Sequence, residues 1–335
     1  MKKIKIAVFG LGRMGSVHLK NIINQEECTA SYIYDINESK LNFFKKKYNL
    51  NSPQNVLHDI YLNKDIDAIF ITTPTNTHLK FILDGIKYNK NIFCEKPIDL
   101  NINKINKIKN LCNSYKKVLQ LGFNRRFDKT VAHLISNTKS GVVGNVEKVI
   151  ITSRDKNAPS YNYLKTSGGI LRDCSIHDID LLRQIFGKDE IQDAFCFGSN
   201  LFDRNAKKLK DFDTIVSIFK TKKNKIGIIN NSRHSAYGYD QRIEVFGIKG
   251  MIQTKNINEN FTSVYNNKKT NSKEKYLNFF LERYEDSFKK ELDAFVSSIK
   301  KKKSVVTFED CRKALVICEC LYRSIKTKKS EKVFF

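Results

Sequence analysis

The fold of this chain is decided by one stretch near its start, Ile4-Lys5-Ile6-Ala7-Val8-Phe9-Gly10-Leu11-Gly12-Arg13-Met14-Gly15. Its first half predicts a buried strand, and that strand runs directly into the pattern G-x-G-x-x-G. Gly10 permits a tight turn, Gly12 lets a phosphate group approach the backbone, and Gly15 lets the next helix pack closely on the sheet. Phosphates would lie against the free N–H groups at that helix's N-terminus. The stretch therefore predicts a dinucleotide site.

Asp35 strengthens this prediction because it ends a second predicted strand, residues 29–34, twenty residues after Gly15. Its carboxylate can accept hydrogen bonds from the ribose hydroxyls of adenosine and repels a 2′-phosphate. This favours NAD over NADP. The alternative is a glycine-rich turn beside an aspartate that binds nothing. The joint occurrence of strand, glycine spacing and acid argues against that alternative.

Length and composition set the broad class of the protein. At 335 residues the chain can form two domains, each with its own core. No apolar run approaches the roughly 20 residues that a membrane-spanning helix needs. The N-terminus lacks a signal-peptide pattern, so we expect a cytoplasmic protein with no membrane partner. The eight cysteines form no C-x-x-C pair, which argues against a zinc site or a disulfide framework.

The formal net charge of +25 would suit a protein that binds nucleic acid. Only 12 of the 60 basic residues are arginine, however, and the lysines are scattered along the whole chain. The lysine clusters at 45–47, 222–223 and 300–303 are not interleaved with aromatic residues, as a base-stacking groove would be. We interpret the excess as a lysine-rich solvated surface and expect no nucleic-acid partner.

The first 122 residues alternate predicted strands and helices. Strands are predicted at 68–72, 91–94 and 118–122, and helices at 39–48, 79–88 and 103–115. This repeat favours a doubly wound parallel sheet, in which ligands bind at the carboxyl edge of the strands. The predicted strand ends on that edge are residues 10, 35, 73, 95 and 122. We assign residues 1–122 to an NAD-binding Rossmann domain.

Beyond residue 122 the predicted strands alternate apolar and polar residues, which is typical of an antiparallel sheet with one covered face. A helix is predicted at 129–137, and strands at 146–153, 214–219, 225–232 and 242–246. A hairpin turn is predicted at 247–250, a mobile surface loop at 256–275, and late helices at 282–300 and 307–326. The predicted class is α/β. Residues 123–335 form a substrate-binding and oligomerisation domain with a large, mostly antiparallel open sheet, whose last helix can pack back on the first domain.

Residues suited to proton transfer occur at two places. Asp173 and His177 are four residues apart in a predicted helix, so both project from one face. A histidine with a carboxylate one turn away can act as a general base; the alternative is a helix cap beside a packed histidine. Lys96 follows a predicted strand end, and Pro97 restricts its backbone to extended conformations. A lysine held there can stabilise a developing alkoxide, so the three residues suit alcohol oxidation.

These segments, taken in order, resemble the family of glucose–fructose oxidoreductase and inositol dehydrogenase. The matching stretches cover nearly the whole chain and lie at 10–18, 73–78, 95–97, 122–128 and 168–180. Segments 153–155, 231–247 and 279–284 are similar to the inositol 2-dehydrogenase branch of this family. Leu171 and Cys174 depart from the residues expected there, which bears on the choice of inositol isomer more than on the chemistry.

The resemblance implies a Rossmann domain followed by an α/β domain whose open sheet supports a dimer or tetramer. It implies catalytic roles for Lys96, Asp173 and His177, with His177 taking the hydroxyl proton while hydride passes to NAD. The polyol pocket would also contain Arg126, Asp155 and Tyr237. No metal is expected. The implied cofactor contacts are Gly10, Gly12, Arg13, Met14, Gly15, Asp35, Thr73, Pro74, Thr75, His78, Glu95 and Lys96.

The function expected from these features is NAD-dependent oxidation of myo-inositol, or of a close isomer, to an inosose in inositol catabolism. The alternatives are another sugar or sugar-derivative dehydrogenase of the same family and a non-catalytic cofactor-binding regulator. The presence of Lys96, Asp173 and His177 together argues against the regulator. The expected small-molecule partner is a cyclic polyol or a sugar, and the expected assembly is a homo-oligomer.

Overall fold

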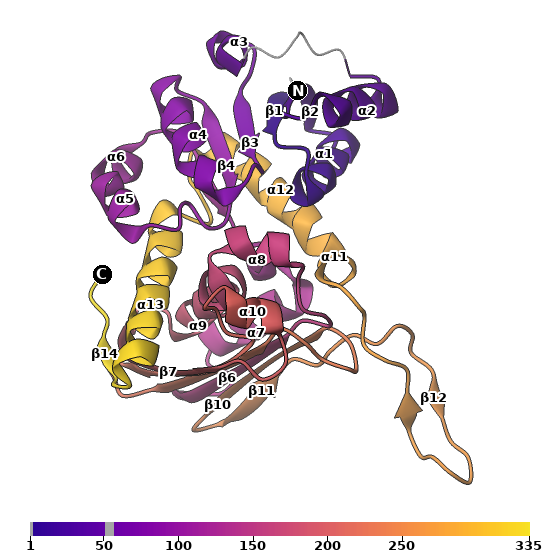
Figure 1. The fold of residues 1–335 in the computed structure, drawn as a ribbon, viewed down its shortest axis with the longest axis vertical. Helices are drawn as coiled ribbons and strands as arrows, with labels where there is room; N and C mark the ends of the chain where they lie inside the picture. Colours follow the sequence, from indigo (N-terminus) through magenta and orange to yellow (C-terminus); the bar gives the residue numbers. More distant parts are fainter. Residues whose placement is uncertain (1–2, 51–56) are drawn as a thin grey trace. The chain divides into compact units, whose positions relative to one another are not determined.

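The computed structural model describes residues 3–50 and 57–335. The chain divides into two compact units, drawn in sequence colours in Figure 1. Unit 1 contains the residues up to Asn124 together with Asp286–Lys313, and unit 2 contains Arg125–Glu285 and Ala314–Phe335. A late segment of the chain therefore returns to unit 1. It contains helix α12 (Glu285–Lys301) from Asp286 onward and the start of α13 (Phe308–Thr327), and the predicted packing of the last helix on the first domain stays a prediction.

Unit 1 is built on a parallel five-stranded sheet in the order β2-β1-β3-β4-β5. The strand order reverses between β1 and β3, and ligands bind at such a switch point in doubly wound sheets. The strands are β1 (Ile4–Phe9), β2 (Cys28–Tyr34), β3 (Ala68–Ile71), β4 (Asn91–Glu95) and β5 (Leu119–Gly122). The helices are α1 (Arg13–Asn24), α2 (Glu38–Tyr48), α3 (Leu57–Leu62), α4 (Thr75–Lys87), α5 (Ile102–Lys107) and α6 (Lys109–Ser114).

The core of unit 1 joins the sheet to α12. Phe70 of β3 and Phe93 of β4 stack with their ring centroids 4.1 Å apart, and Phe295 of α12 meets both rings edge-on. All three side chains are buried. Aromatic pairs of this kind add roughly 0.5–1.5 kcal/mol beyond the burial of their area. A helix distant in sequence is thereby an integral part of the nucleotide-binding unit.

Unit 2 contains a seven-stranded sheet in the order β11-β10-β6-β9-β8-β7-β14. Only β6 and β9 pair in parallel among these strands. The strands are β6 (Val146–Arg154), β7 (Ile191–Ser199), β8 (Thr214–Thr221), β9 (Ile226–Ser232), β10 (Asp240–Gly247), β11 (Gly250–Gln253) and β14 (Glu331–Lys332). The predicted fold class is confirmed: a parallel Rossmann sheet and a second, mostly antiparallel sheet.

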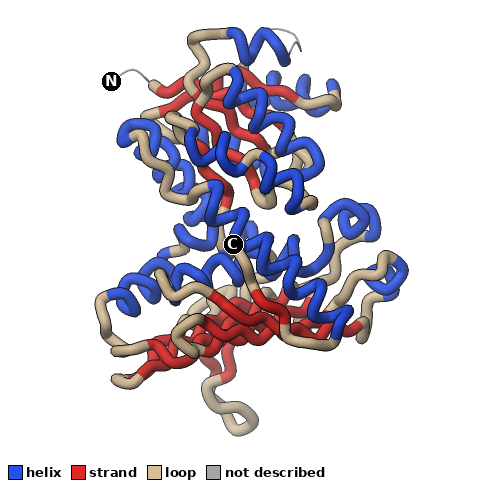
Figure 2. The backbone as a smooth tube through the Cα atoms, turned by 90° about the vertical axis from the view of Figure 1, so that its left-hand side faces the viewer, coloured by secondary structure: helices blue, strands red, loops and turns tan. Residues whose placement is uncertain are grey.

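Helices cover one face of this sheet and leave the other face open, as Figure 2 shows. The helices of the unit include α7 (Lys129–Lys139), α8 (Tyr161–Ser167), α9 (Ile176–Phe186), α10 (Arg204–Lys208) and α11 (Phe280–Arg283). Buried and exposed residues alternate along β8 because successive side chains of a strand point to opposite faces. The covered face carries the core of unit 2.

Three elements differ from their predictions. The helix predicted at 103–115 is broken at Ile108 into α5 and α6. The loop predicted at 256–275 contains a short hairpin of β12 (Ser263–Val264) and β13 (Ser272–Lys273), visible in Figure 1 as an arm that projects from unit 2. The helix predicted around residue 173 begins with a π-helical turn, Leu171–Ser175.

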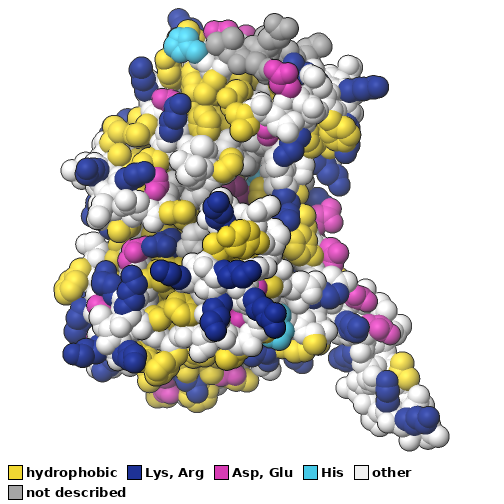
Figure 3. Space-filling view, in the orientation of Figure 1, with side chains coloured by type: hydrophobic (Ala, Val, Ile, Leu, Met, Phe, Trp, Pro, Cys, Tyr) yellow, Lys and Arg dark blue, Asp and Glu magenta, His cyan; other side chains and the backbone are white. Residues whose placement is uncertain are grey.

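The surface agrees with the scattered lysines of the sequence. On the face drawn in Figure 3, Lys and Arg side chains lie in small groups among other side chains and form no continuous band. Within the described residues, no helix combines the length and apolar character needed to cross a bilayer.

Candidate functional site

The glycine turn after β1 is shaped by close backbone approaches at the switch point of unit 1. Gly10 has φ +88°, and a Cβ there would lie 2.7 Å from the backbone nitrogen of Thr73. A Cβ on Gly15 would lie 1.8 Å from the carbonyl oxygen of Gly10. Both positions therefore require glycine for the packing of the turn itself.

Gly12 differs from its two neighbours because a Cβ there would meet nothing within 4 Å. Gly12 is also the N-cap of α1, and this helix has neither a side-chain cap nor an acidic residue in its first turn. The N–H groups at the start of a helix attract anions. The open space over Gly12 and the uncapped helix N-terminus fit the pyrophosphate of a dinucleotide.

Asp35 follows β2 and holds the glycine turn. Its Oδ2 accepts a hydrogen bond from the Leu11 N–H at 2.6 Å, and its Oδ1 accepts one from the Asn37 N–H at 2.8 Å. Each carboxylate oxygen has a further lone pair available for a ribose hydroxyl. Asp35 thus fits the predicted ribose contact and also fixes the turn, a role that the sequence pattern did not reveal.

His78 connects the loops that follow β3 and β4. Its Nδ1 lies 2.8 Å from the carbonyl oxygen of Pro97, and its Nε2 lies 2.7 Å from that of Thr73. Burial lowers the pKa of His78, while the two carbonyl contacts oppose this shift. The buried ring therefore ties the Thr73-Pro74-Thr75 loop to the Glu95-Lys96-Pro97 loop, and its predicted contact with the cofactor stays a prediction.

Glu95 and Lys96 form the turn at the end of β4. The Oε1 of Glu95 lies 2.8 Å from the Nε2 of His18. Among the described residues, Glu291 joins these two to make a group whose polar atoms lie within 4.8 Å of one another. A nitrogen and an oxygen on one tetrahedral zinc ion would be roughly 3.3 Å apart. The shorter distance between His18 and Glu95 is that of a hydrogen bond.

Asp173 is the centre of the polar cluster in unit 2. Its Oδ1 accepts a hydrogen bond from the Tyr163 hydroxyl at 2.8 Å, and its Oδ2 lies 3.1 Å from the Nη1 of Arg233. The Asp173 carboxylate raises the pKa of Tyr163, so Tyr163 remains a donor. Asp173 stands in the π-helical turn and His177 in α9, and their predicted pairing stays a prediction.

Arg233 is fully buried and brings a positive charge to this cluster. Its Nη2 lies 3.5 Å from Asp211, whose two oxygens also accept hydrogen bonds from the Ile170 N–H. Gly169 makes room for this arrangement, because a Cβ there would lie 2.8 Å from the Oδ1 of Asp211. The glycine turn before the π-helical segment thus packs against the carboxylate that pairs with Arg233.

Asp155 lies beside the same group. Its Oδ2 is 3.6 Å from the Sγ of Cys174, which lies 3.5 Å from the Nη1 of Arg233. Burial raises the pKa of Asp155 to about 6, with Arg233 acting in the opposite direction and Asp173 adding to the rise. Cys174, which departs from the family pattern, stands between the two predicted substrate contacts Asp155 and Asp173.

Arg126 and Tyr237 have protein partners. The Nε of Arg126 donates to the Oδ2 of Asp180 at 2.6 Å. The Tyr237 hydroxyl donates to Asp240 at 2.8 Å and accepts from Arg154 at 2.6 Å. These contacts fix both side chains in unit 2, and their predicted contact with substrate stays a prediction.

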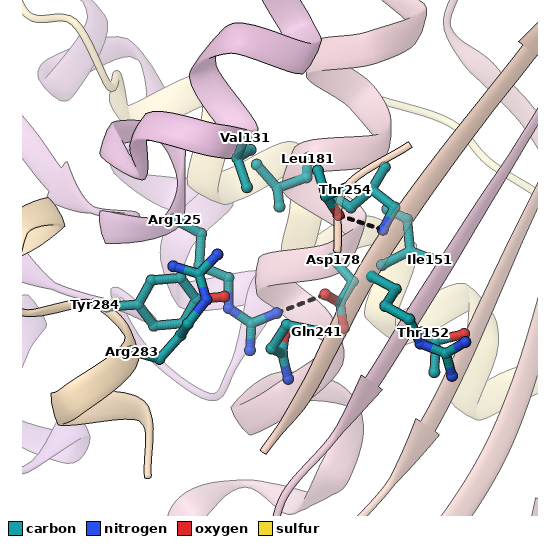
Figure 4. Close-up of a pocket in the computed structure, with 12 residues that line it drawn as sticks. Arg125, Val131, Ile151, Thr152, Asp178, Leu181, Gln241, Thr254, Arg283 and Tyr284 are labelled. Carbon is teal, nitrogen blue, oxygen red and sulfur yellow. Dashed lines mark hydrogen bonds and ion pairs between the residues drawn. The ribbon is translucent and has the colours of Figure 1, made fainter. Parts of the chain in front are cut away.

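A further cavity in unit 2, drawn in Figure 4, is too small for a substrate. It has about 10 Å³ of free space, which is the room of about one water molecule. Beside it, Arg125 donates to Asp178 at 2.6 Å, and burial raises the pKa of Asp178. This ion pair is structural, and the segment 122–128 contributes to it.

The structure brings together Asp155, Asp173 and Cys174 in unit 2, and the loops after β1, β3 and β4 in unit 1. Lys96 belongs to unit 1, so its joint action with Asp173 and His177 stays a prediction. Four residues of these clusters were not predicted from the sequence: Tyr163, Asp211, Arg233 and Glu291. Glu291 had a signal, since it is the acid on the otherwise apolar face Phe288, Leu292, Phe295 of α12. Arg233 lies in segment 231–247, which carried the family resemblance, but its role was not predicted because its partners are distant in sequence.

An open helix N-terminus at a switch point and a ribose-type carboxylate define unit 1 as a dinucleotide-binding unit. The comparisons agree with this class. Residues 4–123 match the oxidoreductase family with an NAD-binding Rossmann fold, and residues 130–253 match the GFO/IDH/MocA C-terminal domain. The chain belongs to this family.

The relatives include a myo-inositol 2-dehydrogenase of Thermotoga maritima, which is 36% identical over 98% of both chains. An inositol 2-dehydrogenase of Rhizobium meliloti is 32% identical over 97% of this chain and 98% of its own. The crystal structure of scyllo-inositol dehydrogenase from Lactobacillus casei with NAD(H) and scyllo-inositol has a TM-score of 0.91 at 28% identity, covering 99% of both chains. The predictions of the family, of NAD as cofactor, and of an NAD-dependent dehydrogenase acting on CH–OH groups are confirmed.

Proposed function

We propose that this protein oxidises myo-inositol, or a close inositol isomer, at a ring hydroxyl to an inosose. The observation that carries the proposal is the cluster of Asp155, Asp173 and Arg233 in a chain similar over nearly its full length to a myo-inositol 2-dehydrogenase. A cyclic polyol presents many hydroxyls, and charged groups held in fixed positions reject isomers that leave them unpaired.

The proposed chemistry uses three side chains. NAD, when bound, accepts the hydride from the carbon that carries the reacting hydroxyl. His177 takes the proton of that hydroxyl as general base. Lys96 donates a hydrogen bond to the same oxygen and stabilises the developing alkoxide. Asp173 orients the substrate and is itself held by Tyr163 and Arg233.

The proposed cofactor contacts follow from unit 1. The pyrophosphate would lie over Gly12 and the first turn of α1, and the ribose hydroxyls would donate to Asp35. The remaining predicted contacts lie in the loops after β1, β3 and β4: Gly10, Arg13, Met14, Gly15, Thr73, Pro74, Thr75, His78, Glu95 and Lys96. Arg126, Asp155 and Tyr237 remain proposed contacts of the polyol.

We also propose a homo-oligomer, a dimer or tetramer, assembled on the open face of the unit 2 sheet. Strand register places Phe197 beside Val216 and Phe246 beside Met251 on this face. Their exposed fractions are 66%, 38%, 41% and 50%. Apolar patches of this kind mark protein interfaces. Light scattering should give a multiple of the 38.8 kDa chain mass, and Phe197→Glu should shift it toward the monomer. A monomeric wild type would contradict this proposal.

The decisive experiment measures initial rates of NAD reduction with myo-, scyllo- and chiro-inositol, glucose and a sugar acid. We expect the highest kcat/KM with an inositol. Lys96→Ala should lower kcat by about 10²–10⁴-fold, because it removes the group that stabilises the alkoxide. The matched control is Lys104→Ala, whose side chain is 60% exposed.

The possible outcomes distinguish the proposed function from its alternatives. A preference for glucose or the sugar acid would favour another sugar dehydrogenase of the family. Binding of NAD without turnover of any substrate would favour a cofactor-binding regulator. Equal kcat/KM with NAD and NADP would contradict the proposed contact of Asp35. A cytoplasmic location and the absence of a nucleic-acid partner stay predictions from the sequence.

A further inference from the structure

Glu291 is a glutamate in an apolar core. It lies on α12 between Phe288 and Phe295 and is fully buried. Neither of its carboxyl oxygens has a hydrogen-bond partner among the described residues. An ionised carboxylate in such a place would lose its hydration without compensation, at a cost of several kcal/mol. The Glu291 carboxyl group must therefore be uncharged or be paired with a positive charge.

The polar groups that face Glu291 are few. His18 comes from α1 and Glu95 from the end of β4, and their polar atoms lie within 4.8 Å of those of Glu291. From β5, Gln120 donates to the backbone carbonyl of Glu291 at 3.4 Å. Lys96 directly follows Glu95 in the turn. The rings of Phe70, Phe93 and Phe288 enclose His18 on its other sides.

Only one of the two ring nitrogens of His18 has a hydrogen-bond partner among the described residues. Its Nε2 lies 2.8 Å from Glu95, whereas its Nδ1 is buried and has no partner among the described residues. A charged imidazolium would leave a buried N–H donor unsatisfied at Nδ1, and the neutral ring with its hydrogen on Nε2 does not. In this neutral form, His18 supplies no positive charge to the two neighbouring carboxyl groups.

Two carboxyl groups that share a buried site without a counter-charge cannot both ionise. Burial raises the pKa of Glu291 well above its ordinary value, and the neighbouring charge of Glu95 adds to the rise. Among the described residues, Glu95 has two polar contacts that Glu291 lacks. Its Oε1 accepts from His18, and its Oε2 lies 3.3 Å from the backbone N–H of Lys96.

The position of Glu95 is further restricted by Gly122 of β5. A Cβ at residue 122 would lie 2.9 Å from the Oε2 of Glu95, so the absence of a side chain there makes room for the carboxylate. His18, Gly122 and Glu291 thus surround the residue that precedes Lys96 in the chain. The Glu95 carboxylate also contacts the backbone N–H of Lys96, so it links these groups to the turn that carries Lys96.

We propose that Glu291 is a positioning residue whose carboxyl group stays protonated at neutral pH beside the Glu95 carboxylate, and that it holds the turn that presents Lys96. This role rests on the proposed function of Lys96. The protonated state of Glu291 does not, because it follows from the burial and charges of unit 1 alone.

The first test is infrared spectroscopy of the wild type and E291Q at neutral pH. A protonated carboxylic acid has a carbonyl band that a carboxylate lacks, so we expect this band in the wild type and its loss in E291Q. Asp293→Asn, at an exposed acid of the same helix, should leave the band in place. Absence of the band in the wild type, or a stoichiometric metal ion in the purified protein, would overturn the proposal.

The second test measures kcat, KM and the pH profile. E291Q should keep kcat within about threefold of wild type, because its amide is neutral and close in shape to a protonated carboxyl group. E291L has no donor and should lower kcat about tenfold or more, with a smaller change in the KM for polyol and a shifted pH profile. Equal losses in E291Q and E291L would overturn the positioning role. If the wild type turned over no polyol, the infrared result would still stand, and the proposed function would fail separately.

Discussion

The glycine turn of unit 1 and the Arg233 cluster of unit 2 use opposite means to prepare a polar ligand site. The turn offers backbone N–H groups at the N-terminus of an uncapped helix. It depends on the lack of a side chain at Gly10, Gly12 and Gly15. The cluster depends on charged side chains, with Arg233 fully buried between Asp173 and Asp211. The first site is sensitive to added atoms, and the second to lost charges.

The ligands that we propose for the two sites account for this difference. A pyrophosphate carries fixed charge and is bound well by backbone dipoles that need no counter-charge of their own. A polyol is neutral and must be distinguished by the direction of its hydroxyls, which requires side chains in fixed positions. Such side chains bear charge, so they require a buried cation such as Arg233 to hold them.

The largest effect is expected from Arg233→Met. Removal of one partner from a buried ion pair leaves Asp173 and Asp211 without their counter-charge and should lower the free energy of unfolding by about 3–5 kcal/mol. Arg323→Met is the matched control, because that side chain is 53% exposed and pairs with Glu331 at the surface. This control should lower the free energy of unfolding by only about 0–1 kcal/mol. Urea unfolding measures the free energy of unfolding of both variants. Similar decreases in the two variants would contradict the special role of the buried Arg233 cluster.

Substitution of two glycines in the turn sharpens the comparison. Gly10→Ala introduces a Cβ at φ +88°, 2.7 Å from the Thr73 nitrogen, and should lower the free energy of unfolding by about 2 kcal/mol or more. Gly12→Ala meets no protein atom within 4 Å, so stability should change by less than about 0.5 kcal/mol. Its methyl group would occupy the space proposed for the pyrophosphate. NAD affinity, measured by titration, should fall about tenfold, and unchanged affinity would contradict the proposed cradle.

The smallest expected effect is the pH dependence caused by Asp155. Its pKa rises from 3.8 to about 6 on folding, so the folded protein binds this proton more tightly than the unfolded chain. The stability that this group contributes is full below about pH 4 and is lost as the pH rises to about 6. Asp155→Asn has no such loss. Its free energy of unfolding relative to wild type should therefore increase by about 1–2 kcal/mol between these pH values.

Urea unfolding of both proteins at pH 4, 5, 6 and 7 measures this difference. The same pH dependence in wild type and variant would mean that Asp155 titrates as an exposed carboxyl. The Arg233 cluster would then be less buried than the structure indicates. It would also differ less from the glycine turn of unit 1, which uses backbone groups.

The sequence by itself determined the glycine turn of unit 1 and the elements on either side of it, because these elements are local. A strand, a glycine turn and a helix follow one another within residues 4–24, and each residue's role depends on backbone geometry that neighbours in the chain impose. The parallel direction of the strands and the alternation along β8 were also predicted, because the βα repeat and the period of two residues can be recognised in short segments. Periodicity and turn chemistry act over a few residues.

Only the tertiary structure decided which charges meet. Arg233 reaches Asp173 across 60 residues, and α12 brings Glu291 to His18 and Glu95 from the far end of the chain. The π-helical turn at Leu171–Ser175 was likewise not predicted, because the sequence pattern was interpreted with the period of an α-helix. A buried charge is tolerated only where distant elements supply its partner, and that condition depends on packing, which no local pattern contains.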